Sequence, residues 1–176
     1  MWYLCGLGSN IRPETNLAIA IDRLLADYGS LWLSPVISTF PEGIDTERSF
    51  LNALVIVFSP QSPQHLKSSF NHLDETLGRD RSDPLSSRKD RTIDIDILEH
   101  SDNGFFSGEQ IGERYYRNLF NDRFDASFLS TITVRGHSLG KTPTTIYRNL
   151  CASDEIVVQQ GQQLNNHGVK STLAGQ

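Results

Sequence analysis

The sequence predicts an α+β domain whose strands and helices follow the order β-α-β-β-α-β, with extra elements near the C-terminus. Two segments have apolar residues at helical spacing, and each begins near a proline and ends at a glycine. Four shorter apolar segments, bounded by turn residues, are typical of strands. A length of 176 residues is enough for one domain with a sizeable core.

The first half of the chain is predicted to contain three strands and one helix. Residues 2–7 are apolar and indicate a short buried strand that ends at the turn Gly8-Ser9-Asn10. The helix at residues 13–29 begins at a proline, repeats apolar residues every three or four positions, and stops at a glycine. Residues 31–39 form a second strand, in which a proline favours an edge or a bulge. The strongly apolar residues 50–58 form a third.

The next two elements complete the order. Residues 63–78 repeat apolar side chains along one helical stripe and end at a glycine. Residues 92–98 (TIDIDIL) alternate strictly between polar and apolar, which indicates a fourth strand. The resulting β-α-β-β-α-β order is that of a ferredoxin-like sandwich.

The pattern beyond residue 100 is weaker. Residues 114–120 indicate a turn or short helix, residues 128–134 a further strand, and residues 142–150 a helix entered through a proline. We assign residues 1–150 to a single α+β domain and expect residues 151–176 to be a polar, mostly loose tail.

The composition is that of a globular protein, with 38% hydrophobic and 21% charged residues. No apolar run is long enough to cross a bilayer, no basic segment of a signal peptide precedes the first strand, and two cysteines give no disulfide framework. We therefore expect a cytoplasmic protein without a membrane partner. The net charge of −5 argues against a nucleic-acid partner. Of the 16 basic residues 12 are arginine, which favours a small phosphorylated ligand.

Asp94 and Asp96 are the sharpest chemical feature. Residues two apart on a strand project to the same face, so the two carboxylates lie side by side and suit Mg²⁺, which binds through oxygen. Spacing alone favours the simpler explanation of a solvated acidic face. Four neighbouring arginines change this balance, because guanidinium groups beside carboxylates form a site for a metal–polyphosphate. These arginines are Arg79, Arg81, Arg88 and Arg91. The alternative is that these arginines form weak ion pairs with the aspartates interleaved among them in a solvated loop.

Four stretches match one enzyme family in the same order. They are Gly8-Ser9-Asn10, residues 39–52, residues 74–81 ending in Gly78-Arg79-Asp80-Arg81, and residues 91–98 (RTIDIDIL). In these stretches the sequence resembles the 6-hydroxymethyl-7,8-dihydropterin pyrophosphokinases of folate biosynthesis. The last stretch is highly specific, and together the four span most of residues 3–98.

The resemblance implies a ferredoxin-like core and a Mg²⁺-dependent transfer of the terminal pyrophosphoryl group of ATP to the hydroxymethyl group of the pterin, releasing AMP. ATP and a pterin are the implied partners, and a monomer is favoured. Asp94 and Asp96 would hold two Mg²⁺ ions, and Arg79, Arg81 and Arg91 would orient the phosphates.

The resemblance also implies two sets of contact residues. Those expected to bind the nucleotide are Asn71, Asp74, Arg79, Arg81, Arg88, Arg91, Ile97 and Arg123. Those expected to bind the pterin are Thr39, Pro41, Phe50, Asn52 and Phe124. In this set Phe50 would stack on the ring and Asn52 would bond its edge. The alternative to pterin binding is that Phe50 is an ordinary core residue and Asn52 an ordinary polar residue at the end of the strand.

Three departures from the family leave a second reading open. Asp90 stands where the family usually has proline, the preceding loop has no tryptophan, and a Pro-His pair is missing after the fourth strand. Arg123 and Phe124 are the expected stand-ins for the family's arginine and pterin-stacking phenylalanine. The alternative function is a non-catalytic or altered-substrate relative that binds a pterin or a nucleotide.

Two other classes fit less well. An RNA-binding module with the same element order needs aromatic and basic residues on its third strand, and that strand is nearly all aliphatic. Residues 136–142 (GHSLGKT) resemble a P-loop, but only three residues separate the glycines where the motif needs four.

Overall fold

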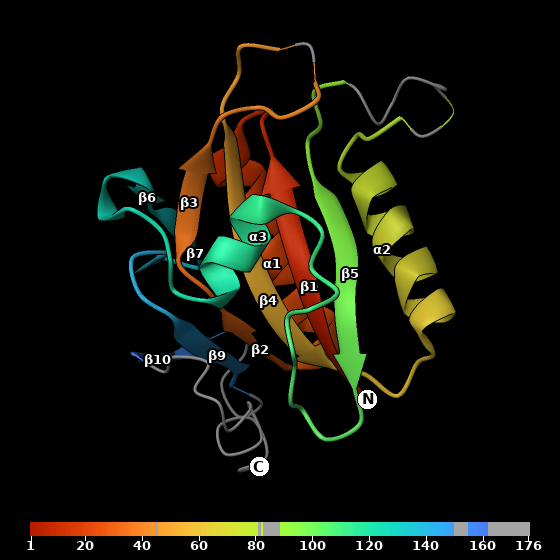
Figure 1. The fold of residues 1–176 in the computed structure, drawn as a ribbon. Helices are drawn as coiled ribbons and strands as arrows, with labels where there is room; N and C mark the ends of the chain where they lie inside the picture. Colours follow the sequence, from red (N-terminus) through yellow and green to blue (C-terminus); the bar gives the residue numbers. More distant parts are fainter. Residues whose placement is uncertain (45, 81, 83–88, 150–154, 162–176) are drawn as a thin grey trace.

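The computed structural model describes residues 1–44, 46–80, 82, 89–149 and 155–161, and it centres on an eight-stranded sheet (Figure 1). The strands of this sheet are β1 (Trp2–Ser9), β2 (Ser30–Leu33), β3 (Val36–Thr39), β4 (Phe50–Phe58), β5 (Asp94–Ser101), β6 (Leu129–Ser130), β9 (Thr144–Arg148) and β10 (Ile156–Gln160). A separate hairpin consists of β7 (Ile132–Val134) and β8 (His137–Leu139). The helices are α1 (Pro13–Tyr28), α2 (Pro63–Thr76), α3 (Arg114–Phe120) and a 3₁₀ turn at Ala126–Phe128.

The sheet is antiparallel at each strand pair that the structure describes. Its main order is β10-β9-β2-β4-β1-β5, and β3 pairs with a further part of β4. The strand β4 therefore lies between β1 and β2, and β5 ends the sheet on one side. The helix α2 packs beside this last strand (Figure 1).

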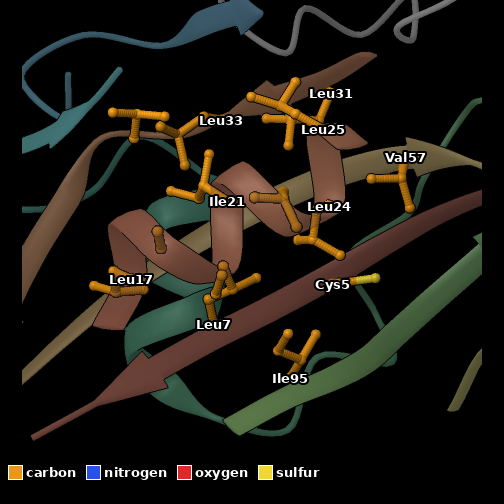
Figure 2. Packing of buried hydrophobic residues seen from close by; sticks show 14 of the residues in the cluster. Cys5, Leu7, Leu17, Ile21, Leu24, Leu25, Leu31, Leu33, Val57 and Ile95 are labelled. Carbon is orange, nitrogen blue, oxygen red and sulfur yellow. The ribbon is translucent and has the colours of Figure 1, made fainter. Parts of the chain in front are cut away.

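Different helices cover the two faces of the sheet. On one face, Ile21 of α1 and Phe70 of α2 pack in the same apolar cluster as Leu7 of β1, part of which is shown in Figure 2. On the other face, Tyr116 of α3 packs in a second cluster with Leu4. Removing these side chains from water drives the layers together. The helices α1 and α2 thus share one face, and α3 covers the other.

The strongest sequence patterns are confirmed. The helix α1 begins at Pro13, and its end at Gly29 has φ 76°, a left-handed conformation that glycine adopts without strain. The strand β4 has the predicted bounds, and residues 114–120 form a short helix. The prediction of a domain that mixes helices and strands is likewise confirmed.

Three segments differ from their predictions. Residues 128–134 were expected to form one strand, but they divide between the end of the 3₁₀ turn, β6 in the main sheet and β7 in the separate hairpin. Residues 31–39 form two strands, because Pro35 interrupts the strand and the next N–H, of Val36, bonds the carbonyl of Gly140 at 2.8 Å. The predicted helix at residues 142–150 is wrong: β9 occupies most of it, and β9 pairs with both β2 and β10. Its Thr-Thr-Ile run suits a strand, and a neighbouring sheet edge decided the outcome.

The last described segment also gains structure. Residues 156–160, which we expected in a loose tail, form β10, whereas residues 151–154 and 162–176 lie outside the described residues.

The P-loop-like segment begins in a hairpin turn, in which Arg135 and Gly136 both have positive φ and join β7 to β8. No helix in the described part of the chain is both long enough and apolar enough to span a membrane.

Candidate active site

The two aspartates of β5 lie beside two glycines of β1. In the antiparallel register Gly8 pairs with Asp94, and Gly6 pairs with Asp96. Directly paired residues project to the same face of a sheet. A Cβ on Gly6 would lie 2.5 Å from the ring of Tyr116 in α3, so this face is the one that α3 covers. The two carboxylates therefore emerge side by side on the α3 face.

Gly6 and Tyr116 are in such close contact that one methyl group is expected to disturb the site. In a Gly6→Ala variant the new methyl would overlap the ring, and overpacking of this kind costs about 1–3 kcal/mol. We expect urea unfolding to show this loss of stability. Gly112→Ala is the matched control, because its Cβ would meet nothing within 4 Å. Equal stability of the two variants would contradict the prediction.

Asp94 is held by two arginines from the loop that precedes β5. Arg79 donates to one carboxylate oxygen of Asp94, and Arg91 donates to the other. Arg79 also lies 3.5 Å from the buried carboxylate of Asp74 on α2. The side chains of Arg79, Arg91 and Asp94 are 9%, 15% and 13% exposed. Solvent and salt therefore screen these ion pairs only weakly.

Asp96 has a different partner, which the sequence analysis did not single out. The ammonium of Lys67 on α2 donates to Oδ1 of Asp96 at 2.5 Å and to the backbone carbonyl of Ile95 at 2.7 Å. The carboxylate side chain is 48% exposed and the lysine side chain is 33% exposed. Asp96 is thus the more accessible of the two aspartates.

A cavity of about 250 Å³ is lined in part by Arg91, the arginine that binds Asp94. Four of the predicted site residues line it together: Thr39, Phe50, Asn52 and Arg91. The guanidinium of Arg91 lies over the ring of Phe50, 5.8 Å from its centre. The amide of Asn52 donates to the hydroxyl of Thr39 at 2.7 Å, which fixes the orientation of the amide. Because Arg91 also binds Asp94, one side chain joins the cavity to the carboxylates.

An aromatic ring that the sequence patterns did not indicate faces this cavity from α3. Tyr115 lines the cavity, whereas Phe124 packs in the apolar cluster beneath α3 and is not among the lining residues. Pro41 is also absent from the lining, although the residues on either side of it belong to it. Burial raises the pKa of Tyr115 to about 12, so its hydroxyl stays protonated at neutral pH. The docking of α3 decides this placement, and no local spacing in the sequence reveals it.

Asn10 is a third residue whose role no pattern in the sequence indicated. It is 4% exposed, and its side-chain oxygen accepts a bond from the backbone N–H of Arg91 at 2.8 Å. Its amide donates to Asp90 at 2.7 Å. Asn10 therefore fastens the segment from which Arg91 reaches both the cavity and Asp94. The only hint in the sequence is its place in the Gly-Ser-Asn turn.

The remaining predicted nucleotide residues are spread around the site. Asn71 lies on α2, and its side-chain oxygen is buried without a hydrogen-bond partner among the described residues. Ile97 lies on β5 and packs against the α1–α2 cluster. Arg123 is exposed after α3. Arg81 and Arg88 lie outside the residues that the structure describes.

The donor set of the site fits Mg²⁺ with a phosphorylated ligand. Asp94 and Asp96 offer only oxygen, and in the described ranges no cluster of three or more His, Cys, Asp or Glu side chains offers another metal cage. A magnesium ion usually takes one or two carboxylates and completes its shell with water and phosphate oxygens. Nearby, the Nε of Arg79 is buried without a partner within the described part of the chain. A free donor beside the carboxylates suits an incoming anion.

Comparisons with known proteins agree with this chemistry. The family model described as 7,8-dihydro-6-hydroxymethylpterin-pyrophosphokinase matches residues 4–119, which is more than half of the chain. Two relatives from Porphyromonas gingivalis, from strains ATCC 33277 and W83, are named 2-amino-4-hydroxy-6-hydroxymethyldihydropteridine pyrophosphokinase. Each is 36% identical over 97 residues, which cover 54% of this chain and 66% of the relative, just under two thirds of its length. The chain belongs to the 7,8-dihydro-6-hydroxymethylpterin-pyrophosphokinase family.

Proposed function

We propose that this protein transfers the terminal pyrophosphoryl group of ATP to the hydroxymethyl group of 6-hydroxymethyl-7,8-dihydropterin and releases AMP, a step of folate biosynthesis. The observation that carries this proposal is that Arg91 contacts both the cavity and a carboxylate. The same guanidinium lies over the ring of Phe50 in the cavity and binds Asp94 on β5. A flat heterocycle in this cavity would therefore sit next to the carboxylates that bind the metal–polyphosphate.

In this proposal the cavity binds the pterin. Phe50 offers an aromatic face for stacking, and Tyr115 lines the same cavity from α3. Asn52 offers an amide that can both donate and accept at the edge of the ring, and its bond to Thr39 holds that amide in place. This pre-organisation lowers the entropy that binding must otherwise overcome.

The carboxylates and arginines bind the polyphosphate. Asp94 and Asp96 would hold two Mg²⁺ ions, which supply positive charge to the phosphates and orient the reacting groups. Arg79 and Arg91 neutralise Asp94 before the nucleotide binds and present guanidinium donors to the phosphate oxygens afterwards. Arg81 and Arg88 are proposed to join them.

The reaction needs accurate positioning more than covalent chemistry from the protein. The hydroxymethyl oxygen of the pterin forms a bond to the β-phosphorus of ATP, and its proton is released to water. The bond between that phosphorus and the oxygen bridging to the α-phosphate breaks, and AMP leaves with the bridging oxygen. The residues of the site hold the two substrates in line and reduce the access of water.

We also propose a ferredoxin-like topology for the segment from β1 to β5. The element order through this segment and the position of β4 between β1 and β2 support it. The two helices on one face, α1 and α2, are those of the two β-α-β units.

The direct test of the function is AMP formation. Purified protein is incubated with ATP, Mg²⁺ and 6-hydroxymethyl-7,8-dihydropterin, and the products are separated by ion-exchange chromatography. We expect one AMP for each pyrophosphorylated pterin, and no AMP without the pterin. If calorimetry shows that both ligands bind but no AMP forms beyond that of an Asp96→Ala control, the protein is the non-catalytic relative instead.

A further inference from the structure

We propose that Lys67 is a positioning residue that acts as a built-in counter-cation of Asp96. In this role it disfavours the binding of free divalent cations in the absence of nucleotide and, once metal and nucleotide bind together, turns its charge toward the polyphosphate. The second part of this proposal rests on the proposed function. The first part rests only on the contacts of Lys67 and Asp96.

The placement of Lys67 links two elements at the edge of the sheet. It lies on α2, whereas Asp96 lies on β5, and α2 packs against β5. Its ammonium bonds the carboxylate at 2.5 Å and also the backbone carbonyl of Ile95 at 2.7 Å. The second bond anchors the lysine to the strand itself. In the absence of ligand the carboxylate of Asp96 therefore already has a cation beside it.

The two aspartates differ in how firmly their cations are held. Asp94 binds two arginines that are at most 15% exposed, so both are packed more firmly into the protein than a partly exposed lysine. Lys67 is 33% exposed, and its partner Asp96 is 48% exposed. A lysine is a point charge on a flexible stem, so it can move away at little cost. Lys67 is thus the cation that an incoming ligand can displace most easily.

The charge of Lys67 has opposite effects on the binding of a free metal ion and of a metal–nucleotide complex. A free divalent cation must displace the ammonium from Asp96 and then stays close to its positive charge, which weakens binding. A metal–nucleotide complex brings phosphate oxygens that accept hydrogen bonds from the released ammonium. Lys67 therefore opposes the metal alone and favours the metal with its nucleotide.

A Lys67→Met variant tests both effects, because methionine keeps the apolar stem and removes the charge. Mn²⁺ binding to the ligand-free protein is measured by electron paramagnetic resonance. Binding of Mg²⁺ with α,β-methylene-ATP, an analogue whose α–β bridge does not break, is measured by calorimetry. We expect Mn²⁺ alone to bind about threefold more tightly, since the competing pair is partly exposed. We expect the magnesium–analogue complex to bind about tenfold more weakly, since a charged hydrogen bond is lost.

Three further variants complete the experiment. Lys67→Arg keeps the charge and is expected to leave Mn²⁺ affinity near that of the wild type. Lys141→Met removes a lysine that likewise bonds a backbone carbonyl, that of Leu129 at 3.2 Å, but lies away from the site. It should change neither affinity. In an Asp96→Asn background the Lys67→Met substitution should no longer raise Mn²⁺ affinity.

The two affinities distinguish the possible results. Opposite changes in Lys67→Met support the proposal, whereas a merely structural lysine would weaken both affinities on removal. Two weakened or two unchanged affinities would overturn the proposal. Failure of the proposed function has a separate signature: wild-type protein that forms no AMP. The Mn²⁺ measurement would still decide whether Lys67 competes with metal at Asp96.

Discussion

Asp94→Asn is expected to lose both activity and stability, whereas Asp96→Asn is expected to lose activity alone. Asp94 accepts from two largely buried arginines, so removing its charge leaves Arg91 without this carboxylate and leaves Arg79 with Asp74. Breaking a buried ion pair from one side typically costs about 3 kcal/mol or more. Asp96 is 48% exposed and pairs with a lysine that is 33% exposed, and an ion pair this accessible to solvent is worth about 1 kcal/mol or less.

Both losses can be measured on the same preparations. Urea unfolding at neutral pH gives the free energy of unfolding, and AMP formation gives the activity. We expect each variant to be slower than wild type by at least about a hundredfold, because each removes a charge that organises the polyphosphate. Equal stability of the two variants would contradict the burial difference between the two sites. Normal activity of either one would contradict the assignment of the carboxylates.

Asn10→Ala is expected to have the second largest effect, although Asn10 touches neither the cavity nor a carboxylate of β5. The substitution removes the side-chain acceptor for the N–H of Arg91 and the donor to Asp90. Leaving the N–H of Arg91 without this acceptor costs about 1–3 kcal/mol, whereas Asp90 is 29% exposed and keeps its ion pair with Arg48. Of its bonds to residues 10 and 11, the segment that carries Arg91 then keeps only the backbone bonds from their N–H groups to the carbonyl of Arg91, at 3.1 and 3.3 Å. We expect a lower kcat and a higher KM for the pterin, together about tenfold to a hundredfold in kcat/KM.

Two variants separate positioning from general stability. Asn121→Ala removes an exposed asparagine whose amide bonds the carbonyl of Arg117 at 2.8 Å, and it should leave the kinetics unchanged. Asn10→Asp keeps the acceptor for Arg91 but places a second carboxylate against Asp90, so it should rescue little. If Asn10→Ala were less stable yet kinetically normal, Asn10 would have a structural role only.

The site was predictable where the chemistry is local. The alternation of residues 92–98 fixes Asp94 and Asp96 on one face, since the side chains of a strand repeat every two residues. In the same way Phe50 and Asn52 share a face of β4, and both line the cavity. Each of these results needs only the geometry of a single element.

The partners of these residues were not predictable by the same reasoning. Lys67 precedes Asp96 by 29 positions, and Asn10 precedes Arg91 by 81. Tyr115 reaches the cavity because α3 docks on the face that Gly6 and Gly8 leave open. Such contacts depend on how whole elements pack, and the spacing within one element holds no information about it.

The sequence by itself determined the bounds of α1 and β4, the shared face of the aspartates and the family resemblance. These properties follow from periodicity, turn residues and motifs within short segments. Only the tertiary structure decided that residues 144–148 form a strand, that Tyr115 rather than Phe124 lines the cavity, and that Lys67 pairs with Asp96. The physical reason is that packing surfaces and sheet edges, contributed by distant segments, select among conformations that the local sequence leaves nearly equal in free energy.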